Sequence, residues 1–478
     1  MIGTQLTLFN SLTRSQEPFA PSDGKTARVY SCGPTVYNFA HLGNLRAYVF
    51  TDTLRRTLLF KGWAVRHVIN ITDVGHLTSD ADAGEDKMEL AAAGLGKDIW
   101  EVAAFYTATF KGNLKDLNIV DPTIWSVATD HIAEMIAFAG KIADQHCYEI
   151  ESGLYFDVTT VPDYGRLARS VSDEGESRID PVSGKRNPQD FAIWRKSPPG
   201  EQRQMEWDSP WGRGAPGWHL ECSVMSLKYL GPEPFDIHTG GIDHREIHHP
   251  NEIAQNQAYC DCTAEQPGFT GARFWMHNNF LVDRTGKMSK SGGGFTTLQS
   301  LIDAGVPPLA YRLLCLTAHY RSELEFSGEA VGAAVTRLKR LVMAAEKLGA
   351  ESGNPSQAYL DRLDAALSDD LNTPQALVAL DEMLADKKLS PADRRATLVR
   401  FDAALGLNLA ALSRTDLRVR PLAATLDAAE IEARLDQRKE ARAAKDFARS
   451  DAIRDELITA GIEVMDGDPL RWEWKVSL

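Results

Sequence analysis

A strand, a loop, a helix and a second strand follow one another between residues 28 and 71, and this order constrains the fold more than any other feature of the chain. Residues 28–31 read as a short strand and residues 65–71 as a buried strand. Between them, residues 41–59 carry apolar side chains near helical spacing. Such a unit opens a doubly wound parallel sheet. We therefore predict an α/β fold with a Rossmann-type parallel sheet.

Composition divides the rest of the chain. A stretch rich in Ser, Gly, Pro and charge over residues 170–216 predicts an irregular insertion at the surface. Helical patterns dominate from residue 307 onward and end in a charged helix over 428–450. We predict a first half of the Rossmann domain (1–120), an insertion (121–217), a second half of the Rossmann domain (218–325), a C-terminal α-helical bundle (326–410) and a terminal region (411–478).

The charge balance limits the partners of the chain. Its 478 residues include 52 Lys and Arg against 66 Asp and Glu, which gives a net charge of −14. An acidic field does not attract nucleic acid, so any such contact needs a local basic surface, and DNA is not an expected partner. No apolar run of about 18 residues and no secretory signal are found, so we expect a cytoplasmic protein without a membrane segment. We expect a monomer.

Two short motifs carry groups that suit phosphate chemistry. His41, Gly43 and Asn44 stand in HLGN at the expected start of the first helix, where free N–H groups attract phosphate and a glycine lets a nucleotide approach. Lys287 and Lys290 stand in KMSKS, between glycines, where mobile cations can meet the charge of a phosphoryl transition state. The alternatives are an ordinary helix start and a solvated lysine loop.

Together, in this order and about 240 residues apart, the two motifs resemble the signatures of the class I aminoacyl-tRNA synthetases. The resemblance implies that ATP is bound by His41, Gly43, Asn44, Lys287 and Lys290, with Mg²⁺ on the nucleotide. It also implies that His41, Asn44 and the two lysines act in catalysis. The first signature usually ends in His. Asn44 keeps a donor without a charge, so we expect the rate to change more than binding.

A second group of residues fits a metal ion. Cys32, Cys222, His248 and Glu252 offer two thiolates, an imidazole and a carboxylate, a plausible zinc set. The alternative is that the cysteines are small core residues and His248 a buried core histidine. The segments CGPTVY, WHLECS and HHPNEIAQ resemble those of cysteinyl-tRNA synthetases, in which these four positions bind one zinc ion. On that basis His249, Cys260 and Cys262 are not expected to be ligands.

The same resemblance implies a cysteine pocket and a ribose contact. Gly33, Thr72, Trp218 and His238 would surround the amino acid, and Asp243 would accept hydrogen bonds from ribose hydroxyls. Loop polarity or helix capping is the alternative for Thr72 and His238. The positions directly after Asp73 (VGHLTS) lack the further acidic residues that the family usually has just after NITD. A thiolate binds zinc far better than a neutral hydroxyl, so the metal would distinguish cysteine from serine.

The end of the chain offers a basic surface. On one continuous helix, basic residues spaced by three and four would form a single stripe able to follow phosphates: Arg434, Arg438, Arg442, Lys445 and Arg449. The alternative is a solvated face with ion pairs along the helix. The segment also resembles the anticodon-side end of cysteinyl-tRNA synthetases. Similarity to that family runs from about residue 6 to 478.

The resemblance implies a ligase that activates L-cysteine with ATP and transfers it to the 3′ end of cysteine tRNA. A related ligase that joins activated cysteine to a small amine is the first alternative, and the basic C-terminal stripe argues against it. A non-catalytic RNA-binding relative is the second. The presence of both lysines and all four zinc ligands argues against that reading.

Overall fold

A five-stranded parallel sheet forms the centre of the computed structural model, which describes residues 3–74, 87–168, 182–198, 200, 203–261, 269–283, 286–287, 296–351, 353–476 and 478. The strand order is β11-β10-β3-β4-β5. Their bounds are β3 (Thr26–Ser31), β4 (Ala64–Ile71), β5 (Ile124–Val127), β10 (Phe235–Gly241) and β11 (Ala272–Asn278). The chain runs outward in opposite directions from the adjacent strands β3 and β10. This topological switch point is where ligands bind in open α/β sheets, and the predicted Rossmann-type fold is confirmed.

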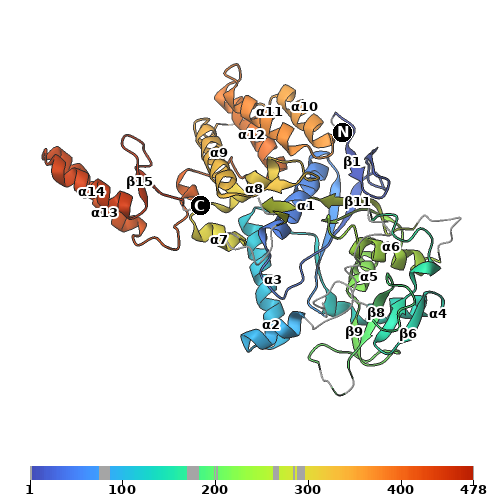
Figure 1. Ribbon diagram of the computed structural model, residues 1–478. Coiled ribbons are helices and arrows are strands. Elements are labelled where there is room, and N and C mark those ends of the chain that lie inside the picture. The colour runs from blue at the N-terminus through green and yellow to red at the C-terminus, as the bar shows by residue number, and fades with distance from the viewer. Residues whose placement is uncertain are drawn as a thin grey trace.

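Helices cover both faces of this sheet. Helix α1 (Leu42–Phe60) connects β3 to β4 and packs on one face, while α5 (Trp218–Leu230) and α6 (His248–Tyr259) lie together on the other (Figure 1). Because both faces are covered, β4 buries the apolar Val68, Ile69 and Ile71, and it also buries the polar His67 and Asn70. Further helices on this half are α2 (Lys87–Leu95), α3 (Ile99–Asp116) and α4 (Ile132–His146).

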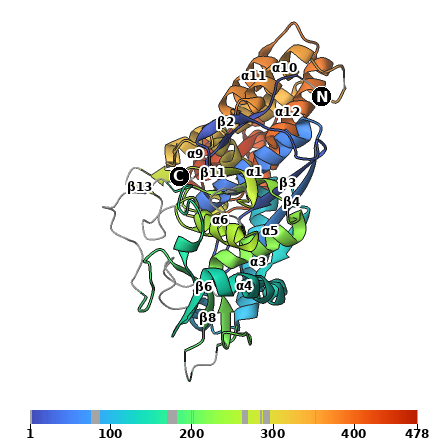
Figure 2. The ribbon, with the colours of Figure 1, turned by 90° about the vertical axis from the view of Figure 1, so that its right-hand side faces the viewer.

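The insertion is more regular than the sequence predicts. Strands β6 (Cys147–Ile150), β7 (Gly153–Phe156), β8 (Phe191–Lys196) and β9 (Gly214–Pro216) form an antiparallel sheet. It lies at the opposite end of the molecule from the bundle (Figure 2). The expectation of an irregular surface segment over 170–216 is therefore wrong for β8, whose first five residues are buried. The apolar run FAIW provides that core, whereas the surrounding Ser and Gly dominate the composition.

The C-terminal half is helical. Its helices are α7 (Leu298–Asp303), α8 (Pro308–Leu316), α9 (Gly328–Glu346), α10 (Gln357–Ser368), α11 (Thr373–Ala385) and α12 (Pro391–Leu405). Short strands also occur outside the two sheets: β1 (Thr7–Asn10), β2 (Ser15–Pro18), β12 (Leu281–Asp283), β13 (Gly286–Lys287), β14 (Leu324–Glu325), β15 (Ile462–Val464) and β16 (Trp472–Trp474). Among the described residues, no helix is long and apolar enough to cross a bilayer.

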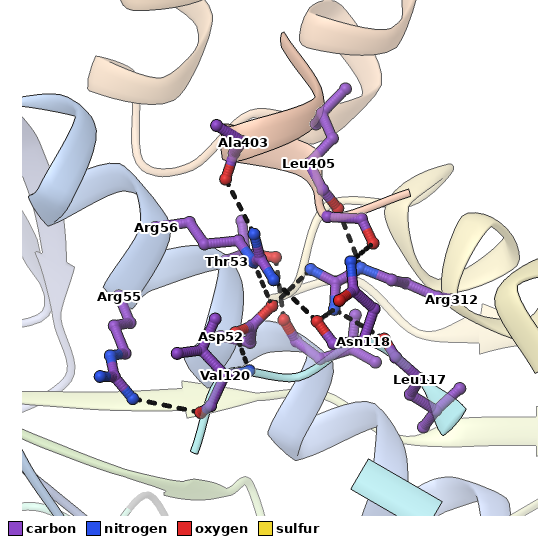
Figure 3. A network of polar contacts seen from close by, with 12 residues as sticks. Asp52, Thr53, Arg55, Arg56, Leu117, Asn118, Val120, Arg312, Ala403 and Leu405 are labelled. Atoms are coloured by element: carbon purple, nitrogen blue, oxygen red, sulfur yellow. Dashed lines mark hydrogen bonds and ion pairs between the residues drawn. The ribbon is translucent and has the colours of Figure 1, made fainter. Parts of the chain in front are cut away.

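A buried polar network joins the bundle to the parallel-sheet domain (Figure 3). The Arg312 guanidinium on α8 pairs with the Asp52 carboxylate on α1 and donates to the carbonyl oxygens of Leu405 (2.9 Å) and Leu117 (2.9 Å). Arg56 also binds Asp52, at 2.7 Å. Helix α1 begins with HLGN, so this junction ties the bundle to the helix that carries the first signature.

The last charged segment is two helices, which corrects the prediction of one. Helix α13 (Ala428–Ala443) ends before Lys445, whose φ is +62°, and Asp446 caps α14 (Phe447–Thr459). The predicted basic stripe is therefore not continuous, because the chain reverses between Arg442 and Arg449. Figure 1 shows α13 and α14 side by side, projecting from the body of the molecule.

Candidate active site and metal centre

A cavity of about 260 Å³ opens at the switch point, beside the carboxyl ends of β3 and β10. It brings together residues from both halves of the sheet. Ten of the predicted site residues line it: Cys32, Gly33, His41, Gly43, Asn44, Thr72, Trp218, Cys222, Asp243 and His248. Thiols lie at one part of the wall and the helix start at another. The cavity thus places the predicted metal ligands next to the predicted phosphate-binding motif.

The four predicted metal ligands converge. One ligand atom from each of Cys32, Cys222, His248 and Glu252 lies within 4.8 Å of the others. His248 Nε2 is 3.4 Å from Cys222 Sγ on α5. It is also 3.1 Å from Glu252 Oε1, because His248 and Glu252 lie one turn apart on α6. Cys32 reaches the group from the end of β3. Two sulfurs, one nitrogen and one carboxylate oxygen are the donor set of a zinc site.

The charges in this group also suit a cation. Burial opposes a charge on Glu252, but the nearby His238 and His248 lower its pKa to about 2. Burial likewise raises the pKa of Cys222, yet the hydrogen bond with Cys32 and the charge of His248 lower it to about 6. Glu252 Oε1 is buried and faces His248 Nε2 at 3.1 Å, itself a predicted ligand atom. A thiolate and a carboxylate that are both anionic, beside an imidazole, fit a zinc ion.

Two histidines that the sequence reasoning excluded or missed lie at this group. His249 Nε2 is 3.3 Å from Cys32 Sγ, and His249 with Cys32, His238 and Glu252 forms a second set close enough to hold a metal. His219 Nδ1 is 2.9 Å from His248 Nδ1, which orients the His248 ring. Each of these histidines directly follows a predicted site residue, Trp218 or His248. Neighbouring residues on a helix point in different directions, so the sequence did not show that these side chains reach the same group.

A hydrogen-bonded chain forms one wall of the predicted cysteine pocket. Gly33 N–H donates to Asn70 Oδ1 (2.6 Å), Asn70 Nδ2 to Thr72 Oγ1 (3.1 Å), and Thr72 Oγ1 to Glu221 Oε2 (2.8 Å). A Cβ atom on Gly33 would lie 1.5 Å from the Asn70 carbonyl oxygen, so only glycine fits this approach. Burial raises the pKa of Glu221 well above its usual value. Asn70 and Glu221 were not among the predicted site residues.

Trp218 and His238 occupy different positions. Trp218 lines the cavity, with its ring centroid 4.4 Å from that of His248. His238 lies behind the metal group: its Nε2 is 2.9 Å from Glu252 Oε2 and its ring stacks on Trp275. The described cavity lining does not include His238. His238 therefore contacts the predicted metal ligand Glu252 and is not part of the cavity wall.

The HLGN motif starts α1 as a capping box. His41 Nδ1 accepts from the Asn44 N–H (3.1 Å), and Asn44 Oδ1 accepts from the His41 N–H (3.2 Å). This reciprocal cap satisfies two N–H groups at the helix start. Asn44 fits the position where the family signature usually has His, because its Oδ1 atom accepts the His41 N–H and completes the cap.

The KMSKS segment is described only at its edges. Strand β13 pairs Lys287 with Val282 on β12. Lys290 and the atypical segment at 75–86 lie outside the described residues, as does the side chain of Lys287. After the segment, the Leu42 N–H donates to the Thr296 carbonyl (2.8 Å), and His41 forms a backbone bridge with Thr297. The described flanks thus lie against HLGN.

The predicted tRNA-binding residues are in unequal positions. Arg438 is buried and binds Asp466 with both terminal nitrogens (2.5 and 2.9 Å), while Arg442 is 3.6 Å from the same carboxylate. Arg434 lies 3.4 Å from Glu456. Lys445 and Arg449 are exposed. Trp472 is fully buried in the small core of this region, so it packs there instead of facing solvent.

Comparison with known proteins agrees with this geometry. Residues 18–336 match the family described as "tRNA synthetases class I (C) catalytic domain", and residues 428–474 match "Cysteinyl-tRNA ligase anticodon binding domain". A cysteine–tRNA ligase of Novosphingobium aromaticivorans is 63% identical over 481 residues, covering 99% of this chain and 97% of that protein. One of Zymomonas mobilis is 57% identical, covering 98% and 97%.

Solved structures show the same fold at low identity. A LeuRS of Agrobacterium radiobacter K84 has a TM-score of 0.58 at 12% identity, over 84% of this chain and 87% of that one. A methionyl-tRNA synthetase of Mycobacterium tuberculosis has a TM-score of 0.51 at 13% identity, over 80% and 90%. By the match of both family regions and of near full-length relatives, the chain belongs to the cysteine–tRNA ligase family of class I tRNA synthetases.

Proposed function

We propose that the chain joins L-cysteine to cysteine tRNA in two steps at the switch-point cavity. A carboxylate oxygen of cysteine attacks the α-phosphorus of ATP, and the bond to the leaving pyrophosphate breaks. A ribose hydroxyl at the tRNA 3′ end then attacks the carbonyl carbon of the adenylate, loses its proton, and AMP leaves. The observation that carries the proposal is one cavity lined both by Cys32, Cys222 and His248 and by His41, Gly43 and Asn44.

The nucleotide would lie at the HLGN end. There the N–H groups at the start of α1 would donate to the phosphates, which Gly43 allows to approach the backbone. The Asp243 carboxylate would accept hydrogen bonds from the ribose hydroxyls. Asn44 uses its Oδ1 atom in the cap, so its Nδ2 is the donor for phosphate. Lys287 and Lys290 are the cations that stabilise the transition state, and Mg²⁺ arrives with the nucleotide. No general base is required for the first step, because the attacking carboxylate is already ionised and correct placement lowers the barrier.

Cys32, Cys222, His248 and Glu252 are the residues that would hold zinc. Zinc, when bound, supplies a position at which a thiolate is a far better ligand than a hydroxyl. The convergence of the four ligand atoms within 4.8 Å of one another supports this assignment. Thr72, Gly33 and Trp218 would enclose the rest of the amino acid. His238 would orient Glu252 from behind through its 2.9 Å hydrogen bond.

The second region supports tRNA over a small amine as the acceptor, because residues 428–474 match an anticodon-binding domain. Among the predicted basic residues, Arg442, Lys445 and Arg449 are exposed. Arg442 lies 3.6 Å from the Asp466 carboxylate, so Lys445 and Arg449 are the pair that would most readily meet tRNA phosphates. We propose a cytoplasmic monomer; two cysteines that must stay reduced suit a reducing compartment.

The test combines metal content with cysteine-dependent ATP–pyrophosphate exchange on the purified chain. We expect about one zinc per chain and exchange with cysteine but not with serine. Metal-depleted protein should accept serine relatively better, since the metal is the selective group. Loss of turnover at saturating cysteine without any loss of discrimination would contradict the assigned role. Charging of tRNA, compared with capture of the adenylate by small amines, separates the two acceptors.

A further inference from the structure

Arg46 is a buried arginine close to the first signature. It lies on α1 two residues after Asn44, and only 2% of its surface is exposed. Its guanidinium donates to backbone carbonyl oxygens: Nη1 to Asn279 (2.9 Å) and Phe280, and Nη2 to Ser322 (2.6 Å) and His319 (3.4 Å). No ion pair joins it to a carboxylate among the described residues. Both terminal nitrogens of the side chain therefore hold backbone.

The backbone that Arg46 holds leads into the KMSKS segment. Asn279 and Phe280 line the cavity and directly precede β12, which pairs with β13 at Lys287. Ser322 and His319 precede β14, which pairs with the other edge of β12. A single guanidinium thus fixes the three-stranded β13-β12-β14 sheet to the start of α1.

The far side of the KMSKS segment is anchored at the same place. The Thr296 carbonyl accepts from the Leu42 N–H at 2.8 Å, and Thr297 bridges His41. Both described flanks, ending at Asp283 and resuming at Thr296, therefore rest on the first turns of α1. The flank that resumes at Thr296 is held by backbone hydrogen bonds. The flank that ends at Asp283 is held through the Arg46 side chain.

We propose that Arg46 is a positioning residue. It fixes the backbone that leads into the KMSKS segment, strand β12 with its partner β13 at Lys287, relative to the start of α1. Arginine suits this task because its planar fork addresses several carbonyls at once, while lysine is a point charge on a flexible stem. Misplacement of about 1 Å in such a constellation costs roughly a hundredfold in rate. The inference rests on the transition-state role proposed above for Lys287 and Lys290.

A double-mutant cycle between Arg46→Met and Lys290→Ala tests the inference. We expect Arg46→Met to lower kcat for ATP–pyrophosphate exchange about tenfold or more, with KM for ATP changed less than about threefold, because the lysines act in the transition state. In the Lys290→Ala background the same change should cost about threefold or less, since one of its targets is absent. Arg46→Lys should recover part of the rate.

Arg28→Met is the matched control. Arg28 also donates to two backbone carbonyls, of Leu230 and Pro234 (both 2.8 Å), but at the far end of β3. Any loss it causes should multiply with that of Lys290→Ala. Zinc content and thermal unfolding of every variant report folding.

Two results would overturn the inference. Losses from Arg46→Met that multiply fully with those of Lys290→Ala would assign Arg46 a structural role only, and the proposed function would stand. A fully active Lys290→Ala would instead overturn the proposed role of the lysines, and the inference about Arg46 with it. If Arg46→Met is too unstable to assay, Arg46→Lys takes its place in the cycle. Its loss of kcat must then also be smaller in the Lys290→Ala background than in the wild type.

Discussion

Replacing Arg312 by Met should destabilise the junction between the bundle and the parallel-sheet domain. Both Arg312 and Asp52 have side chains with 0% exposure. The substitution removes the donors to the Leu405 and Leu117 carbonyls, each 2.9 Å away, and one of the two arginines paired with Asp52. Arg56 remains 2.7 Å from Asp52 and also binds the Asn118 carbonyl, so part of the network survives.

The magnitude follows from what is left unpaired. Breaking a buried ion pair costs about 3–5 kcal/mol, and an orphaned buried carbonyl about 1–3 kcal/mol. Because Arg56 still compensates Asp52, we expect about 4 kcal/mol in total. For a cooperative unit of about 200 residues this lowers Tm by about 10 °C. Arg337→Met removes a partly exposed partner of Asp381 and should cost less than about 1 kcal/mol.

Differential scanning calorimetry of the full chain provides the measurement. The first unfolding transition should fall by about 10 °C in Arg312→Met and by less than about 3 °C in Arg337→Met. Burial favours protonated Asp52, but Arg312 and Arg56 hold its pKa below the usual value. The stabilisation is therefore present above the unfolded-state pKa and is lost as pH falls, so the difference between wild type and Arg312→Met should shrink in acid. Equal shifts in the two variants would refute the reasoning.

Three further predictions concern the metal group, a buried histidine and the terminal region. Cys222→Ser should lose zinc, measured by atomic absorption, together with discrimination against serine; full zinc content would exclude Cys222 as a ligand. Burial lowers the pKa of His67 to about 3, so protonation favours the unfolded state and the free energy of unfolding should fall as pH drops below about 6.5. In His67→Gln the midpoint of urea unfolding should therefore depend less on pH over that range. An unchanged pH dependence would contradict the assignment. Arg449→Met should raise KM for tRNA about threefold without changing Tm, whereas Arg438→Met should lower Tm because Arg438 is buried against Asp466, and the reverse pattern would show that the exposed residue is not the tRNA contact.

Local pattern was enough to predict the elements around the site. Alternating strand and helix periodicity between residues 28 and 71 indicated β3, α1 and β4, and the structure confirms them within two residues. HLGN was expected to start a helix, and it does so as a capping box. These features depend on neighbours within one or two turns of the chain, so the sequence alone contains them. Local pattern wrongly predicted one helix over 428–450. The chain reverses at Lys445, and packing between α13 and α14 stabilises this reversal.

Tertiary structure alone decided which side chains meet. Cys32, Cys222 and His248 are separated by up to 216 residues in the chain, and only the adjacency of β3 and β10, with α5 and α6 beside them, brings their ligand atoms within 4.8 Å. The positions of His249, Glu221 and Arg46 depend likewise on which face of a helix is buried against what. The periodicity of apolar residues shows which face of a helix or strand is buried. It does not show which other element that face packs against, because packing of the whole chain decides the long-range contacts.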